Sequence, residues 1–174
     1  YITGCEVGQK TTTSIDDQNN TVTEITNGSV NINGEYALGG IAGAMSNAVG
    51  GFIDSCSVGA GTTITRKAFY GSNIANNKVS EDGKYGTAIG GLVGYTESYE
   101  TKQVTTTFSG ENTFAGTIDV SVETDNSNDK AANIGGIVGD MAAGANFASG
   151  SVVTVSGTIS IGNADNAIAA TNIG

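Results

Sequence analysis

The stretch "ETDNSNDK", which begins at Glu123, gathers four carboxylate or amide side chains within five residues: Asp125, Asn126, Asn128 and Asp129. Hard cations such as calcium prefer carboxylate and amide oxygens as ligands. The order of these residues matches neither the D-x-[DN]-x-[DN]-G calcium loop nor the nonapeptide calcium repeat GGxGxDxUx. A structural calcium site and a solvated loop therefore both remain open, and we expect no other cofactor.

Residues for acid, base and nucleophilic chemistry are scarce. The chain contains no histidine, which removes the commonest general base and the commonest zinc ligand. The arrangement nearest to a catalytic cluster is Arg66 with Lys67 and Asp54, but nothing in their spacing specifies that they converge. We therefore expect no enzyme and no catalytic residues, with a polysaccharide-processing enzyme as the alternative.

Aromatic residues suggest a binding surface. We expect the side chains of four tyrosines to be exposed, namely Tyr36, Tyr70, Tyr85 and Tyr95. An exposed tyrosine ring can stack on a sugar or anchor a protein partner. The candidate ligand-binding residues are the last three, two of which lie in the long glycine-bearing excursion 69–86. The alternative is that these rings cover the ends of a core.

Charge and composition narrow the partners further. Seventeen acidic against seven basic residues give a formal charge of −10, which repels phosphate backbones, so we expect no nucleic acid partner. No apolar run approaches the roughly 20 residues that cross a bilayer, so no membrane insertion is expected in this segment. Since the sequence opens on Tyr1, we interpret it as a mature or excerpted segment whose targeting information has been removed.

The elements that would position these residues follow from an internal repeat. A glycine motif occurs as "LGGIAGAM", "IGGLVGYT" and "IGGIVGDM", beginning at Leu38, Ile89 and Ile134. Each copy is followed, after a polar gap, by a stretch that opens with an aromatic residue; these openings are Tyr1, Phe52, Tyr99 and Phe147. The openings stand 51, 47 and 48 positions apart. This period divides one domain into repeats of approximately 1–51, 52–98, 99–146 and a truncated 147–174.

The segments between these motifs show the periodicity of β-strands. Runs rich in threonine and β-branched residues begin at Thr11, Thr62, Gln103 and Ser151. In "GTIDVSVET", Ile118, Val120 and Val122 alternate with polar residues, which is the period of a strand. About three short strands in each repeat predict an all-β fold, specifically a right-handed parallel β-helix (β-solenoid). It would have about four rungs of about 45–51 residues with loop insertions, each rung about 4.8 Å from the next.

In such a fold the glycine motifs would form corners. We expect their glycines to permit a positive φ or a close backbone contact; they are Gly39, Gly40, Gly43, Gly90, Gly91, Gly94, Gly135, Gly136 and Gly139. Leu38, Ile89 and Ile134 should then lie directly atop one another. A phosphate loop needs a different spacing, and a membrane GxxxG interface needs an apolar 20-mer.

The same alignment makes a prediction about the cysteines. Cys5 and Cys56 each stand four residues after their aromatic, so they should lie in neighbouring rungs, with Gln103 as the next member of that column. Val7 and Val58 should stack likewise. A disulfide and a ladder of buried thiols both remain open.

Threonine columns introduce a further alternative. Thr63 and Thr65 alternate around Ile64, and Thr105 and Thr107 alternate in the same way. Regularly spaced threonines on a flat solenoid face order water, so an ice-binding solenoid is conceivable. The columns are interrupted in the first and fourth repeats, and the ordinary explanation of threonine here is strand propensity with hydrogen bonds along the ladder.

With these residues in view, the chain resembles the GLUG-motif repeats of bacterial cell-surface and adhesin-like proteins. The glycine boxes are GGIAG at Gly39, GGLVG at Gly90 and GGIVG at Gly135. The alternating partner stretches are ITGCEVG at Ile2 and IDSCSVG at Ile53. The third and fourth partner stretches lack the cysteine, and the repeats are longer than typical units.

The resemblance implies a non-catalytic structural or adhesive segment of a large bacterial protein at an extracellular or cell-surface location. Examples are an adhesin or the non-catalytic region of a bacterial immunoglobulin A metallopeptidase, whose zinc-binding histidine motif is absent here. We expect its partner to be a surface glycan, a host protein, or copies of itself joined through the solenoid ends into a filament.

Overall fold

The computed structural model describes residues 1–34, 37–47, 51–66, 87–98, 105–120, 132–141, 145–161 and 170–173. These residues contain no helix, and almost all of their strands pair in parallel. The prediction of an all-β fold is therefore confirmed. No helix that could span a membrane occurs in these ranges.

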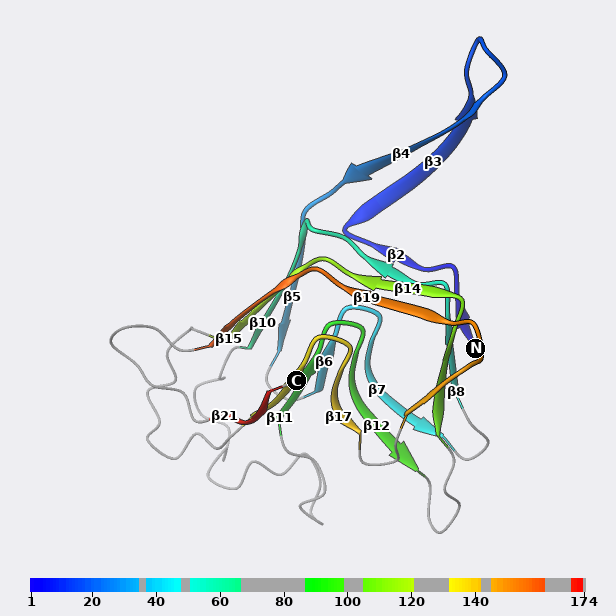
Figure 1. The fold of residues 1–174 in the computed structure, drawn as a ribbon. Coiled ribbons are helices and arrows are strands. Elements are labelled where there is room, and N and C mark those ends of the chain that lie inside the picture. The colour runs from blue at the N-terminus through cyan, green and yellow to red at the C-terminus, as the bar shows by residue number, and fades with distance from the viewer. Residues whose placement is uncertain are drawn as a thin grey trace.

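The chain makes four successive passes, and each pass adds one strand to each of three outer sheets, which we call walls (Figure 1). Wall 1 contains β1 (Ile2–Thr3), β8 (Gly51–Asp54), β13 (Thr106–Ser109) and β18 (Ala145–Phe147). Wall 2 contains β2 (Glu6–Val7), β9 (Ser57–Val58), β14 (Glu111–Phe114) and β19 (Val152–Val155). Wall 3 contains β5 (Val30–Gly34), β10 (Thr62–Arg66), β15 (Thr117–Val120) and β20 (Thr158–Ile161). In every wall the strands follow the order of the passes.

Two further parallel sheets lie inside the space that the walls surround (Figure 1). Inner sheet 1 contains β6 (Ala37–Gly39), β11 (Thr87–Gly90), β16 (Ala132–Gly135) and β21 (Ala170–Ile173). Inner sheet 2 contains β7 (Ala42–Asn47), β12 (Val93–Ser98) and β17 (Val138–Met141). In each of the first three passes, the glycine motif turns the chain from inner sheet 1 into inner sheet 2, which makes a narrow arch.

Glycine lets the two inner sheets approach closely. A Cβ atom at Gly94 would lie 2.6 Å from the backbone nitrogen of Leu38, and one at Gly39 would lie 2.7 Å from the nitrogen of Gly94. At the arch tip, a Cβ at Gly91 would meet the ring of Phe114 in wall 2 at 2.5 Å. None of the nine motif glycines has a positive φ. Of the two expected reasons for glycine, close backbone contact is therefore correct and positive φ is wrong.

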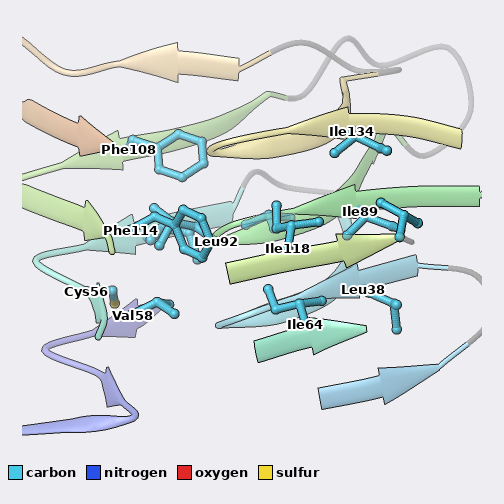
Figure 2. Close-up of a cluster of buried hydrophobic side chains, with 13 residues drawn as sticks. Leu38, Cys56, Val58, Ile64, Ile89, Leu92, Phe108, Phe114, Ile118 and Ile134 are labelled. Atoms are coloured by element: carbon cyan, nitrogen blue, oxygen red, sulfur yellow. The ribbon is translucent and has the colours of Figure 1, made fainter. Parts of the chain in front are cut away.

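The glycine motifs of successive passes lie in register. Ile89 pairs with Leu38 on one side and with Ile134 on the other, and Ile134 pairs in turn with Ile173. Figure 2 shows the first three of these side chains as a column. The prediction that Leu38, Ile89 and Ile134 lie atop one another is confirmed.

The core lies between the arches and the walls. Its largest fully buried side chains are Phe108 and Phe114, and Ile64 lies next to Ile118 along wall 3 (Figure 2). Ile118 and Val120 are buried, as the alternation in their strand predicts. Val122, the third residue of that pattern, lies outside the described residues. Inward apolar columns therefore run through all four passes.

One part of the first pass leaves this arrangement. β3 (Gln9–Ile15) and β4 (Thr21–Asn27) form an antiparallel hairpin that projects from the body between walls 2 and 3 (Figure 1). The run at Thr11 is therefore not equivalent to the run at Thr62. The wall strand of the first pass is β5, whose Ile32 pairs with Ile64. The hairpin is an insertion with the same threonine-rich alternation as a wall strand.

The aromatic landmarks are only partly equivalent. Tyr1 stacks on Phe52, with ring centroids 4.7 Å apart. In the third pass, however, the residue that pairs with Phe52 is Thr107. The prediction that Tyr99 is the third-pass counterpart of Phe52 is therefore wrong. Tyr99 itself lies outside the described residues. Phe147 pairs with Phe108, one position further along the strand. The expected boundary at 99 therefore falls before the third wall 1 strand, because the preceding connection is longer than the alignment allowed.

Candidate functional site

The outer surface of wall 3 carries a regular array of polar side chains. In β10, the side chains of Thr62, Ile64 and Arg66 are buried, whereas those of Thr63 and Thr65 are partly exposed. β5 and β15 show the same alternation, and in β20 Thr158 is exposed while Ser160 is half-buried. We call the outward set the polar face; it consists of Asn31, Asn33, Thr63, Thr65, Thr117, Asp119, Thr158 and Ser160.

Strand register arranges the polar face as two columns of four residues. The first column is Asn31, Thr63, Thr117 and Thr158, and the second is Asn33, Thr65, Asp119 and Ser160. Neighbours within a column lie about 4.8 Å apart, and the columns lie about 6.6 Å apart along the strand. The face thus presents closely spaced hydroxyl and amide groups and one carboxylate.

An apolar layer holds this face from behind. Ile32, Ile64, Ile118 and Ile159 pair in register between the two columns and point to the interior. Ile64 and Ile118 are fully buried. β-branched side chains have few rotamers and pack well on a pleated strand, so this column holds the strands that carry the polar face.

Sequence reasoning found two members of this face but not the whole. Thr63 and Thr65 were expected to belong to columns with Thr105 and Thr107, yet Thr107 lies in wall 1 and Thr106 is buried there. The first pass does interrupt the threonine columns, but with Asn31 and Asn33 of β5, because the hairpin is not part of wall 3. The interruption expected in the fourth pass is wrong for the first column, which continues with Thr158. A signal for the first-pass strand was present in the sequence. Asn31 and Asn33 flank an isoleucine in the same way as Thr63 and Thr65 flank Ile64.

Of the candidate tyrosines, Tyr95 lies among the described residues. Tyr95 lies in β12 and is only 5% exposed, so the expectation of an exposed ring is wrong. Its strand lies inside the walls, where a bulky residue fills space. Tyr36, Tyr70 and Tyr85 lie outside the described residues.

The candidate calcium loop, with Asp125, Asn126, Asn128 and Asp129, also lies outside the described residues. Within the ranges that are described, no three or more His, Cys, Asp or Glu side chains gather as metal ligands. A structural calcium ion therefore stays a sequence-based hypothesis.

The nearest arrangement to a catalytic cluster is not assembled among the described residues. Asp54 ends a wall 1 strand, where its carboxylate accepts a hydrogen bond from Ser109 Oγ at 2.9 Å. Arg66 ends a wall 3 strand and is only 3% exposed. Wall 2 separates these two strands along the chain, and Lys67 lies outside the described residues.

The cysteine column is present, with one substitution. The residues after Cys5 and Cys56 pair in register, and the N–H of Ser57 donates to the carbonyl of Cys5 at 2.8 Å. Val7 and Val58 pair as predicted. The third member of the column is Asn112, which replaces the predicted Gln103; residue 103 lies outside the described residues.

Both cysteines are free thiols. Cys56 is fully buried and Cys5 is half-buried. Burial raises the pKa of the Cys56 thiol. A protonated thiol is a weak nucleophile and metal ligand, so this column acts as packing.

Two exposed carboxylates stabilise the hairpin locally. Glu6 accepts hydrogen bonds from the N–H and the hydroxyl of Thr11 at the hairpin base, and these bonds lower the pKa of Glu6. At the tip, Asp16 accepts the N–H groups of Gln18 and Asn20 at 2.9 and 2.8 Å. The bonds from Asn20 are the main reason why the pKa of Asp16 is lowered.

Comparison with known proteins identifies no relative. The resemblance to GLUG repeats therefore rests on the glycine boxes and the cysteine-bearing stretches alone. No protein-family model, no curated protein and no solved structure matches this chain.

Proposed function

We propose that this chain is a non-catalytic structural and adhesive segment of a secreted or surface-anchored bacterial protein of the GLUG-repeat type. Its four passes would form a right-handed parallel β-solenoid, which is a rigid scaffold for a ligand-binding surface. The extracellular or cell-surface location belongs to the same proposal.

The polar face of wall 3 is the observation that carries this proposal. Its two columns offer hydrogen-bond donors and acceptors at a fixed repeat, on strands that the apolar layer holds in place. A polyhydroxylated chain suits such an array because each sugar can exchange several hydrogen bonds with it. The formal charge of −10 and the carboxylate of Asp119 favour a neutral glycan over an acidic one.

Native affinity electrophoresis in gels that contain dextran or mannan would test this proposal. We expect retardation of the wild-type chain and its loss in Thr63→Ala with Thr117→Ala, which are neighbours within one column. The matched control is Thr113→Ala with Thr154→Ala, a paired set in wall 2. Equal retardation of both variants would contradict a glycan site on wall 3, and release of shortened glycan would contradict the non-catalytic assignment.

Ice binding is the second candidate, and the first column of the polar face favours it. The first column contains Thr63, Thr117 and Thr158 in consecutive passes, which is the regular hydroxyl spacing that orders water on a flat surface. Ice crystals grown in the presence of the chain would develop facets if this function is correct. Round, unshaped crystals would exclude it and leave the glycan proposal unaffected.

A further inference from the structure

The hairpin of β3 and β4 is inserted at a corner that the second pass closes with three residues. Val7 pairs with Val58 before this corner, and Val30 pairs with Thr62 after it. Residues 59–61 join these positions in the second pass, whereas residues 8–29 join them in the first. The solenoid therefore closes the corner without a hairpin, and the inserted strands are available for another role.

Backbone hydrogen bonds define which groups of the hairpin point outward. The N–H of Gly28 donates to the carbonyl of Gly8 at 3.0 Å. Near the tip, the N–H of Asp16 donates to the carbonyl of Asn20 at 2.9 Å. In an antiparallel ladder, residue pairs that exchange hydrogen bonds alternate with pairs that do not. The even-numbered pairs therefore hold the hairpin together, and the odd-numbered residues direct their N–H and carbonyl groups to its two outer edges.

A carboxylate protects the outer edge of β3. The outward N–H of Thr11 donates to the carboxylate of Glu6 at 2.9 Å, and the Thr11 hydroxyl donates to the same carboxylate. The side-chain amide of Gln9 donates to it as well, at 3.4 Å. Another strand could pair along β3 only after it displaced this carboxylate. A charge in such a place is a common protection against edge-to-edge pairing.

The outer edge of β4 has no such protection within the described ranges. No described group bonds to its outward N–H and carbonyl groups, which belong to Thr21, Thr23, Ile25 and Asn27. All seven residues of β4 are exposed, five of them are β-branched, and the only charge is that of Glu24. A two-stranded hairpin alone is marginally stable in water. The open edge is therefore a template for strand addition.

The sequence of β4 fits a second copy of itself. A two-fold antiparallel pair centred on Thr23 places Thr21 opposite Ile25. The outward groups of both edges then meet, as the ladder requires. Val22 lies opposite Glu24 in this register, so no like charges face each other. A pair centred on Glu24 would instead place two carboxylates directly opposite, which is unfavourable.

The position of the hairpin leaves room for this pairing. The hairpin projects from the body between walls 2 and 3 (Figure 1). Because the two β4 strands run antiparallel, the two bodies lie at opposite ends of the shared sheet. A pair centred nearer the body, on Ile25, would bring the other copy's turn at 16–20 beside β5. The register centred on Thr23 therefore meets both the charge and the space requirements.

We infer that two copies of this chain associate through the outer edges of their β4 strands. The product is a four-stranded antiparallel sheet with the order β3, β4, β4 and β3. The carboxylate of Glu6 keeps both β3 edges closed, so the association stops at two copies. This inference goes beyond the proposed glycan-binding function and does not depend on it.

Sedimentation equilibrium between about 1 µM and about 1 mM chain would test the inference. We expect a reversible dimer and no larger species. Thr23→Pro removes an outward N–H of β4 and leaves the hairpin ladder intact. It should weaken dimerisation at least about tenfold, which corresponds to about 1.4 kcal/mol.

Thr13→Pro is the matched control for this variant. Thr13 is the direct partner of Thr23, and its N–H points to the edge of β3. We expect Thr13→Pro to dimerise as the wild type does. Equal dimerisation of the two proline variants would overturn the inference. So would a wild-type monomer over the whole range, which is the result expected if the edge served a strand of another protein.

A charge exchange tests the register. Val22→Glu would place a carboxylate opposite Glu24 of the other copy and should weaken dimerisation at least about tenfold. Adding Glu24→Lys to the same chain would replace this repulsion with attraction and should restore the dimer. Ser14→Glu is the control, because it adds the same charge at the partner of Val22 on β3. A loss that Glu24→Lys does not restore would contradict the inferred pairing.

A chain without residues 9–27 tests the hairpin as a whole. This chain keeps Gly8, Gly28 and Ser29 between Val7 and Val30, which equals the length of the second-pass corner at 59–61. We expect it to remain folded, with the far-ultraviolet circular dichroism of a β protein, and to be monomeric at every concentration. Dimerisation of the shortened chain would place the interface elsewhere and overturn the inference.

Discussion

The side chain of Asn112 accepts a hydrogen bond from the backbone N–H of Cys56 at 3.0 Å. The amide group of the same side chain donates to the carbonyl of Ser109 at 2.7 Å. Asn112 is fully buried and occupies the column of Cys5 and Cys56. Its side chain therefore joins the second and third passes at the turn between walls 1 and 2.

Replacing Asn112 with leucine should destabilise the fold. Asn112→Leu keeps a similar volume but leaves the N–H of Cys56 buried without this partner, which costs about 1–3 kcal/mol. The carbonyl of Ser109 loses one hydrogen bond, worth about 0.5–1.5 kcal/mol, and keeps the one from the N–H of Ser55. We therefore expect the free energy of unfolding in urea to fall by about 1.5–4.5 kcal/mol. Asn33→Leu on the exposed polar face is the control, with a change within about 0.5 kcal/mol. Similar losses in both variants would contradict this role of Asn112.

Close packing of the arches makes a second prediction. Gly94→Ala would place a methyl group 2.6 Å from the backbone nitrogen of Leu38, where only backbone movement provides room. We expect a loss of about 1–3 kcal/mol or more. Gly28→Ala is the matched control, since a Cβ there meets nothing within 4 Å. Thermal unfolding of both variants would test this contrast, and a neutral Gly94→Ala would show that the arches are wider than described.

The turns from wall 1 to wall 2 share a left-handed residue. Gly4, Gly110 and Gly150 have positive φ at these turns, and Ser55, with φ of 53°, takes the same place in the second pass. A residue with a Cβ in this conformation costs about 1–2 kcal/mol relative to glycine. Ser55→Gly should therefore raise the free energy of unfolding by about 1 kcal/mol.

Gly150→Ala tests the same turn conformation in the opposite direction. A Cβ at Gly150 would meet nothing within 4 Å, so its φ of 79° is the only source of strain. We expect a loss of about 1 kcal/mol on denaturation. The same sign of change in Gly150→Ala and Ser55→Gly would be incompatible with a shared left-handed turn.

The buried thiol of Cys56 should make stability depend on alkaline pH. Its pKa is raised in the folded chain above the usual 9.0, chiefly by burial. The stabilisation is fully present below the pKa of the unfolded thiol. It is lost as the pH rises through the higher folded pKa, since the unfolded state releases its proton first. We expect the free energy of unfolding to fall more steeply as the pH rises above 9.0, the usual pKa of a free thiol, in the wild type than in Cys56→Ala. Parallel curves would mean that the thiol is not buried.

The stacking of the glycine motifs was predictable from sequence because the same close backbone contact requires glycine in each motif. Leu38, Ile89 and Ile134 precede glycines that the neighbouring backbone forces to lack a side chain. A constraint that recurs in every pass keeps the motif recognisable. The same holds for Cys5 and Cys56, whose flanking residues are alike.

The polar face could not be read from the sequence in the same way. An exposed hairpin strand and a wall strand both place threonine on a solvated side, so the run at Thr11 resembled the run at Thr62. Only the long-range pairing of Ile64 with Ile32 distinguishes the wall strand from the hairpin strand. Tyr95 illustrates the opposite error, because a tyrosine beside polar residues looks exposed until the arch is seen to lie inside the walls.

Spin labels on wall 3 test the in-register stacking of passes most directly. Thr63 and Thr117 are 54 positions apart in the sequence (117 minus 63) but are direct partners. We would attach nitroxides to Thr63→Cys and Thr117→Cys in a chain that also carries Cys5→Ser and Cys56→Ala. Because neighbouring strands lie about 4.8 Å apart, we predict strong dipolar broadening of the doubly labelled spectrum. A spectrum equal to the sum of the two singly labelled ones would contradict the stacking.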